Sequence, residues 1–237
     1  MARTLDPQAH RRKREAILDV LEHLIVTRGY DRVTIADILG AAGISKGAFY
    51  HYFQAKDDVL TALLERRLRA WEVALAPIVE RPGPALDRLR AFLATLSGAK
   101  SADREFLVEA AAPVLAESNA IVAARLRREG AARLTPLVTR VLTDARDEGS
   151  ITQDDPAALA DIVITLVQDL ADRSGRAILA IMQGSAGPDD LRRTVTAHVG
   201  ALQRVLALDH GELDFVTGPD IEAWASAAAR RRVPEEK

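Results

Sequence analysis

The segment from Ser45 to Phe53 carries side chains suited to binding nucleic acid. Phe49 and Phe53 are four residues apart, so in a helix they lie on one side, toward a core. A lysine ammonium can bind phosphate or the O6 and N7 atoms of guanine, and tyrosine and histidine tips can reach phosphate oxygens or base edges. A small surface helix with aromatic residues and a lysine is the alternative. The outer side that we predict to contact DNA consists of Lys46, Gly47, Tyr50 and His51, with Tyr52 at its flank.

Two short helices are expected to position this outer side. Thr34 and Asp37 form a Thr-x-x-Asp capping box ahead of an apolar run, so a helix should begin at Ile35. Gly43 provides the backbone freedom to end that helix and turn, and Ser45 can cap a second one. Two short helices joined by a tight turn that contains glycine predict a helix-turn-helix, whose second helix can enter a DNA major groove.

The run from Gly29 to Leu60 resembles the DNA-binding domain of the TetR/AcrR family of bacterial transcriptional regulators. The match has no gaps, and Leu39 departs from it where the family often has alanine. The resemblance implies that Lys56 contacts phosphate, and it covers about the first quarter of the chain. The residues that carry it are Gly29, Tyr30, Thr34, Ile35, Ile38, Ala42, Gly43, Ile44, Ser45, Lys46, Gly47, Phe49, Tyr50, Phe53, Lys56 and Leu60. The predicted DNA-binding residues are Thr34, Ser45, Lys46, Gly47, Ala48, Tyr50, His51, Tyr52 and Lys56.

Composition limits the alternatives. The chain has 237 residues, a net charge of −2 and no cysteine, which excludes disulfides and thiolate metal sites. Residues 1–56 contain nine Lys/Arg and six Asp/Glu, whereas the remainder contains 23 and 28. A basic end on an acidic body suits a protein that binds phosphates at one end, although the excess is small. No apolar stretch is long enough for a membrane span and no signal peptide is recognisable, so we expect a cytoplasmic protein that does not bind membranes.

Hydrophobic spacing predicts helices throughout, and no strand pattern stands out. The basic run Arg11 to Arg14 is expected to precede the first helix and to lie along DNA or in its minor groove, or to be a solvated tail. The all-α protein is predicted to have a helix-turn-helix domain over 1–56, a helical effector-binding and dimerisation domain over 57–210, and a tail over 211–237 with a possible short helix after Pro219. Arg230, Arg231, Arg232 and the final Pro-Glu-Glu-Lys are expected to be frayed. The expected helices span residues 10–28, 56–78, 84–98, 102–117, 119–148, 156–183 and 188–208.

The last two long helices, 156–183 and 188–208, have apolar stripes wide enough to serve a core and a partner. In the family that this chain resembles, such helices form a four-helix bundle with those of a second subunit. The resemblance therefore implies a homodimer, although a monomer could use both stripes in its own core.

Polar or aromatic residues within the apolar helices are candidates for a small-molecule site, because a pocket needs a few polar groups to orient a ligand. Asp169–Arg173 and Asp172–Arg176 have i,i+4 spacing, so ordinary surface ion pairs are the alternative, which is favoured for any single residue. Because the lining would be mainly Leu, Val and Ala, a hydrophobic effector is expected. The predicted ligand-binding residues are Trp71, Phe92, Phe106, Glu109, Gln168, Asp169 and Asp172.

Catalytic chemistry has little support. The sequence contains no Gly-rich phosphate loop, HExxH or Gly-x-Ser-x-Gly motif, so we predict no catalytic residue, no cofactor and no enzyme activity. His198 is expected to be a satisfied histidine near an apolar seam. The acidic stretch 209–214 superficially resembles a metal loop but lacks the alternating oxygen ligands of a calcium site, so no metal is predicted.

These expectations converge on a ligand-responsive, sequence-specific DNA-binding transcriptional regulator, most simply a repressor released by a small hydrophobic effector. Its partners would be a double-stranded DNA operator, that effector and a second copy of the chain. The alternatives are a helical small-molecule-binding protein or enzyme with a vestigial helix-turn-helix, and a protein–protein adaptor.

Overall fold

The computed structural model describes residues 7–209 and 211–231, without the side chain of Ser118. The chain divides into two compact units, Met1–Arg67 and Leu68–Lys237, called here the head and the body. The division lies within one helix, α4 (Lys56–Val79), whereas the predicted domain boundary lies at the start of that helix. All regular elements in the described ranges are helical, as predicted. None of these helices is long and apolar enough to cross a membrane.

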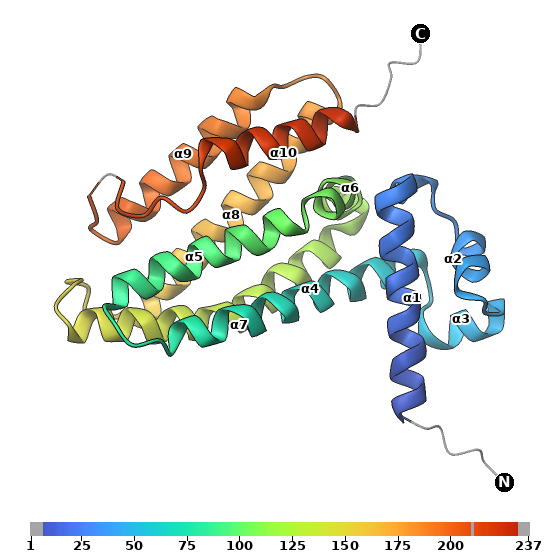
Figure 1. Cartoon of the computed structure of the whole chain (residues 1–237), viewed down its shortest axis with the longest axis horizontal. Coiled ribbons are helices and arrows are strands. Elements are labelled where there is room, and N and C mark those ends of the chain that lie inside the picture. Colours follow the sequence, from blue (N-terminus) through green and yellow to red (C-terminus); the bar gives the residue numbers. More distant parts are fainter. Residues whose placement is uncertain (1–6, 210, 232–237) are drawn as a thin grey trace. The chain divides into compact units, whose positions relative to one another are not determined.

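In the head, α2 (Ile35–Ala42) and α3 (Lys46–Tyr52) are short helices beside α1 (Pro7–Arg28), as Figure 1 shows. A 3-10 turn, η1 (Tyr30–Arg32), connects α1 to the capping residue of α2. The prediction that the basic run Arg11–Arg14 precedes the first helix is wrong, because α1 begins at Pro7 and includes it. The head core consists mainly of Ile17, Leu18, Leu21, Leu24, Ile25, Ile38, Phe49, Phe53, Leu60 and Leu63.

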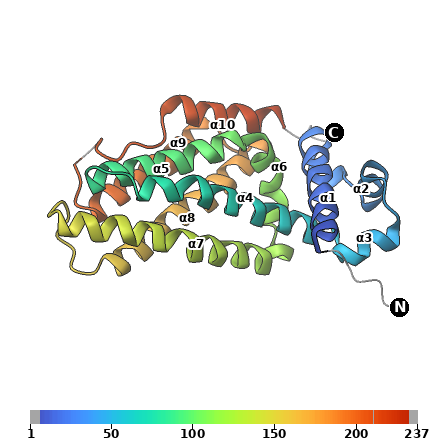
Figure 2. The same cartoon turned by 60° about the horizontal axis from the view of Figure 1, so that its bottom comes forward.

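The body is a set of long helices in which α7 packs against α8, and α8 against α9 (Figure 2). Their order and approximate bounds agree with the hydrophobic spacing of the sequence. The elements are α5 (Ala85–Ala102), α6 (Arg104–Leu115), η2 (Glu117–Asn119), α7 (Ala120–Asp147), α8 (Pro156–Met182), α9 (Pro188–Val205) and α10 (Gly218–Arg230).

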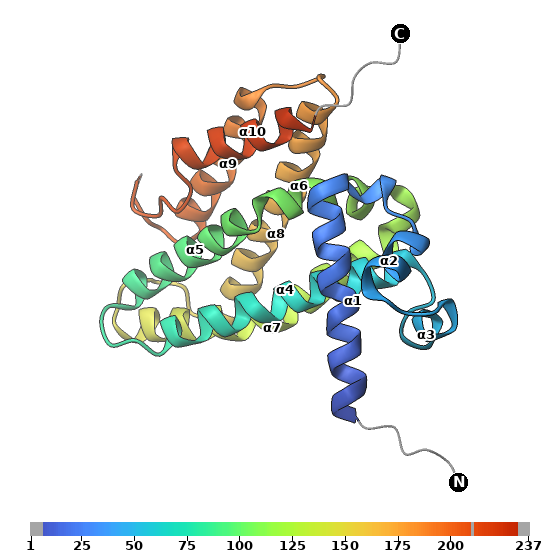
Figure 3. The same ribbon diagram turned by 45° about the vertical axis from the view of Figure 1, so that its right-hand side comes forward.

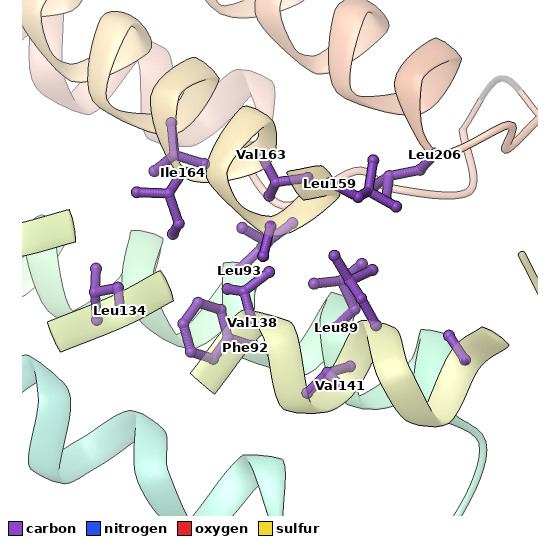
Figure 4. Close-up of a cluster of buried hydrophobic side chains, with 14 of the residues drawn as sticks. Leu89, Phe92, Leu93, Leu134, Val138, Val141, Leu159, Val163, Ile164 and Leu206 are labelled. Atoms are coloured by element: carbon purple, nitrogen blue, oxygen red, sulfur yellow. The ribbon is translucent and has the colours of Figure 1, made fainter. Parts of the chain in front are cut away.

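The main core of the body lies where α5, α7 and α8 meet (Figure 4). Phe92 is fully buried there. Leucine and valine side chains recur every three or four residues along each helix, which places one apolar face of each against the others. The side chains that Figure 4 labels in this cluster are Leu89, Phe92, Leu93, Leu134, Val138, Val141, Leu159, Val163, Ile164 and Leu206.

Local signals set several helix ends. The Asp155 carboxylate accepts hydrogen bonds from the backbone N–H groups of Ala157 and Ala158 at 3.1 and 3.0 Å, and Pro156 occupies the first helical position. Helix α9 ends at Val205, before the predicted residue 208, and Ala207 then adopts a positive φ of 54°. The prediction that the helix continues to 208 is therefore wrong.

Helix α10 belongs to the body core. Thr217 and Asp220 form a capping box at its start, and Ile221 and Ala225 are buried among apolar residues of α8 and α9. Figure 3 shows α10 alongside α9. The expectation of frayed arginines is wrong for Arg230 and Arg231. Arg230 lies within α10 and forms an ion pair with Glu105 of α6 at 2.7 Å, and Arg231 forms one with Glu109 of α6 at 2.9 Å. The rest of the predicted frayed end, residues 232–237, lies outside the described residues.

Candidate nucleic-acid interface

Side-chain caps fix both helices of the helix-turn-helix. The Thr34 hydroxyl accepts from the Asp37 backbone N–H at 3.2 Å, and the Asp37 carboxylate accepts from the Thr34 backbone N–H at 2.9 Å. The Thr34 hydroxyl also donates to the Asp37 carboxylate, at 2.6 Å, and this bond, followed by the one from the Thr34 backbone N–H, lowers the pKa of Asp37; Arg28 at 3.1 Å lowers it further. Gly43 takes the left-handed conformation at φ 61°, which ends α2. Ser45 then accepts from the Ala48 N–H at 3.2 Å, so both predicted starts are confirmed.

Helix α3 has the two sides that its spacing predicts. Phe49 and Phe53 are buried, with exposed fractions of 0% and 4%, and their ring centroids are 6.0 Å apart. Lys46 and Gly47 are exposed. Tyr50 is also exposed, at 38%, although its side chain is large and partly apolar. These groups are free to approach a ligand outside the head, and their contact with DNA remains a prediction.

Tyr52 and His51 are partly held by α1. The His10 ring lies 4.6 Å from the Tyr52 ring and 5.6 Å from the His51 ring, centroid to centroid. His51 is exposed and Tyr52 is half-buried. Sequence reasoning did not single out His10, because no local spacing relates α1 to α3. The contact places the start of the basic run beside the predicted DNA-binding helix.

Three predicted DNA-binding residues also have structural tasks. The hydroxyls of Thr34 and Ser45 cap α2 and α3, and Ala48 supplies the N–H that Ser45 accepts. Thr34 additionally donates its hydroxyl hydrogen to Asp37 at 2.6 Å. A phosphate contact from Thr34 would therefore come at the expense of this bond, whereas the outer residues of α3 bear no such constraint.

Lys56 is engaged within the head. Its ammonium donates to the backbone carbonyls of Tyr30 and Val33, both at 2.9 Å, and lies 4.0 Å from the centroid of the Tyr30 ring. The Tyr30 hydroxyl donates to Asp57. Burial, followed by this hydrogen bond, raises the pKa of Tyr30. Lys56 thus ties the segment before α2 to α4, and this leaves one of its three N–H donors for the predicted phosphate contact.

A second cation fixes α4 to α1. Arg66 donates to Glu15 at 3.1 Å, to Asp19 at 2.7 Å and to Glu22 at 2.6 Å. Arg67 also donates to Glu22, at 2.6 Å. Burial alone would lower the pKa of Arg66, but the hydrogen bonds to Asp19 and Glu15 raise it. We call this group the Arg66 cluster, and it holds the head helices in one arrangement.

Comparison with known proteins agrees with this geometry. The family described as "Bacterial regulatory proteins, tetR family" matches residues 17–63, which include the core of α1, both caps and the start of α4. The N-terminal domain belongs to the tetR family. The matched range ends within the head, so this family match concerns the DNA-binding domain.

Curated relatives share this tetR domain. The chain is 51% identical over 53 residues to the uncharacterized HTH-type transcriptional regulator YwcC of Bacillus subtilis, which is 22% of this chain and 24% of that protein. It is 34% identical over 80 residues to the HTH-type transcriptional repressor NemR of Escherichia coli K12, which is 33% of this chain and 40% of NemR. The chain thus spans less than half the length of the curated relatives it matches. Both are named transcriptional regulators rather than enzymes.

Structural similarity extends over the body. A TetR-family transcriptional regulator from Pectobacterium atrosepticum aligns with a TM-score of 0.64 and 19% identity, covering 84% of this chain and 97% of that chain. At this identity the comparison establishes the fold alone. The protein therefore combines a tetR helix-turn-helix domain with a helical C-terminal domain.

The predicted ligand-binding residues occupy several places in the body. Trp71 Nε1 donates to Asp103 at 3.2 Å, whereas Phe92 and Phe106 are buried in the core. Glu109 forms an ion pair with Arg231 at 2.9 Å. Their role in ligand binding remains a prediction.

The three polar candidates of α8, Gln168, Asp169 and Asp172, form hydrogen bonds with Arg127 of α7 or Arg173 of α8. Gln168 donates to the Arg127 backbone carbonyl of α7 at 2.7 Å, and Asp172 accepts from Arg127 at 2.8 Å. The suggested Asp172–Arg176 pair is thus replaced by a contact between helices. Asp169 accepts from Arg173 at 2.7 Å, which confirms that i,i+4 pair.

Asp169 also joins α8 to α9. Its carboxylate lies 2.9 Å from His198 Nε2, and His198 Nδ1 lies 2.7 Å from the Thr194 carbonyl. The hydrogen bond with His198, then that with Arg173, lowers the pKa of Asp169. His198 is thus a satisfied histidine, as predicted. An open hollow of about 440 Å³ lies here, lined by Asp169, Arg173, Arg193, Thr194, Ala197 and His198.

No metal site is apparent in the part of the chain that the structure describes, where no three His, Asp or Glu side chains gather suitably. The stretch 209–214 includes His210, which lies outside the described residues, so that interpretation is not resolved.

Proposed function

We propose that the protein is a dimeric, ligand-responsive, sequence-specific DNA-binding transcriptional regulator of the cytoplasm, and that it acts as a repressor released by a small hydrophobic effector. The observation that carries the proposal is the exposed side of α3, with Lys46, Gly47, Tyr50 and His51, on a capped helix-turn-helix of a tetR-family domain. The name of the relative NemR supports repression.

Binding to DNA would use one α3 from each of two copies. Two such helices contact half-sites one helical turn apart, about 34 Å, so the operator should be a palindrome. Lys46 and Tyr50 would contact base edges or phosphates, and the basic run in α1 would add phosphate contacts.

The second copy would bind through α8 and α9. The apolar faces of these helices that point inward are covered by α7 and α10, and their outer sides retain Ile162, 49% exposed, and the exposed Ala197. A side with an apolar residue and a small one suits close helix packing between identical subunits.

An effector would act through the body. It can shift the protein toward a form that does not fit the operator only by as much as its affinities for the two forms differ. The predicted ligand-binding residues of the body are the candidates for that site.

The direct test is binding of the full-length protein to the DNA beside its own gene, with a shuffled duplex of equal composition as the control. We expect tight, sequence-dependent binding that weakens steeply with salt, because phosphate contacts release counterions. Absence of binding at low salt would contradict the proposal, and equal binding to both duplexes would contradict sequence specificity at this DNA.

A further inference from the structure

Lys100, near the C-terminal end of α5, is a cation held inside the body. Burial lowers the pKa of Lys100 to about 8, and the Asp172 carboxylate of α8 opposes that shift. Its side chain nevertheless keeps an intermediate exposure. Part of it therefore borders space that solvent can enter, although most of its surroundings are protein.

The Lys100 ammonium has no hydrogen-bond or ion-pair partner among the described residues; its recorded neighbours are the Trp71 ring, 5.8 Å from Nζ, and the Asp172 charge. Two other partly buried cations of the body, Arg88 and Arg133, are paired with carboxylates. Arg88 donates to the Val79 carbonyl at 2.8 Å and lies 2.9 Å from Asp144, and Arg133 lies 2.7 Å from Glu72. An unpaired buried cation is costly, so its retention calls for an explanation.

Acidic groups around Lys100 are already bound by other donors. Asp103, three residues along, accepts from Trp71 of α4, and Asp172 accepts from Arg127 of α7. Trp71 also packs against the large apolar cluster of the body. Helices α4, α5, α7 and α8 thus supply an apolar surface, carboxylates that already accept hydrogen bonds from other donors, and one ammonium without a hydrogen-bond partner.

We propose that this cluster binds a small molecule with an apolar body and one carboxylate, and that Lys100 Nζ binds the carboxylate. The inference rests on the proposed function in taking this molecule to be the effector. A carboxylate would supply the charged hydrogen-bond acceptor that the ammonium lacks, while the Trp71 ring would cover the apolar part.

The test compares carboxylates with uncharged molecules of the same shape. Octanoate and 4-phenylbutyrate, with octanol and 4-phenylbutanol as their controls, are titrated calorimetrically into the wild-type protein, Lys100→Met and Arg128→Met. Arg128→Met removes an exposed charge from α7 of the same unit. We expect Lys100→Met to bind the carboxylates at least about tenfold more weakly than the wild type does. The alcohols should bind the wild type and Lys100→Met equally. Arg128→Met should bind all four molecules as the wild type does.

A pH series adds a readout that packing alone would not change. Burial lowers the pKa of Lys100 to about 8, and the charged groups that surround it are Asp103, Asp172 and, on α7, Arg127. Carboxylate affinity of the wild type should therefore fall as the pH rises through 8, and that of Lys100→Met should not. Lys100→Gln serves the same purpose if Lys100→Met does not fold.

Two results would overturn the proposal: no carboxylate binding by the wild type, or equal carboxylate binding by the wild type and the Lys100 variants. Operator binding is measured separately. Lys100-dependent carboxylate binding without operator binding would refute the proposed function alone, and operator binding without carboxylate binding would refute this inference alone.

Discussion

Lys56 and Arg66 of the head differ from Lys100 of the body in what surrounds their charges. In the head, Lys56 donates to two backbone carbonyls, and Arg66, with 25% of its side chain exposed, contacts three carboxylates. In the body, Lys100 keeps its charge near Trp71 without such a partner. Paired cations fix the geometry of a surface, whereas an unpaired one leaves capacity for a ligand. The contrast is in line with the proposed roles, DNA binding by the head and effector binding by the body.

The two units also differ in what stabilises them. The head joins a small apolar core to polar contacts between elements far apart in sequence, and the body depends on a large apolar cluster where α5, α7 and α8 meet. Polar contacts near the surface weaken with salt, whereas apolar burial does not. Salt should therefore separate the two units experimentally.

The largest expected effect is in the body core. Phe92→Ala should lower the free energy of unfolding by about 3–5 kcal/mol, because Phe92 is fully buried and its loss leaves a cavity. Denaturant titrations at low and high salt should give the same loss. Val73→Ala, at a side chain 73% exposed, is the control and should change stability little. A loss that depended strongly on salt would contradict the apolar account of the body.

The next effect is in the head. Arg66→Met should destabilise it by about 1–3 kcal/mol, because Glu15, Asp19 and Glu22 lose their shared partner. The difference from the wild type should shrink as salt rises, and Arg69→Met, at an exposed position on the same helix, should show little change. Denaturant titrations in which hydrogen exchange of the α1 amides is monitored measure the stability of both variants at each salt concentration. A difference independent of salt would show that the Arg66 cluster acts by packing.

Lys56→Met distinguishes positioning from phosphate contact. The variant should melt at a lower temperature and bind operator more weakly, because the Tyr30 and Val33 carbonyls lose their donor. The dependence of log affinity on log salt should flatten by clearly less than one unit, since most of the ammonium is engaged internally. Flattening by about one full unit would instead establish a direct phosphate contact.

The smallest effect concerns the α2 cap. Hydrogen bonds with Thr34 lower the pKa of Asp37 below its ordinary 3.8, so the ionised carboxylate stabilises the folded head. A lowered pKa in the folded state gives stability that is present above about pH 4 and is lost as pH falls through the folded pKa. Asp37→Asn should therefore melt below the wild type at pH 7, and the gap should close in acid. A constant gap would assign the effect to geometry alone.

Local signals predicted much of the fold, including the two helices that carry the candidate DNA-binding side. The Thr34 and Asp37 box, Gly43 and the Phe49–Phe53 spacing act within one or two helical turns, so the sequence displays them directly. The same holds for the Asp155–Pro156 start of α8.

Contacts between distant elements could not be predicted. Arg66 meets Glu15 across most of the head, and each residue alone resembles a solvated surface charge. Helix α10 was only suspected, because its alanines carry little periodic signal until α8 and α9 cover them. Lys100 was not singled out, since its missing partner is a property of the fold.

The central claim is that the exposed side of α3 binds DNA in a sequence-dependent way. It is tested most directly by measuring the affinity of Lys46→Ala and Tyr50→Ala for operator and shuffled duplexes at fixed salt, with folding checked by circular dichroism. We predict that both variants stay folded and lose operator affinity, by about tenfold for a lost base contact. Unchanged operator affinity in both folded variants would contradict the account.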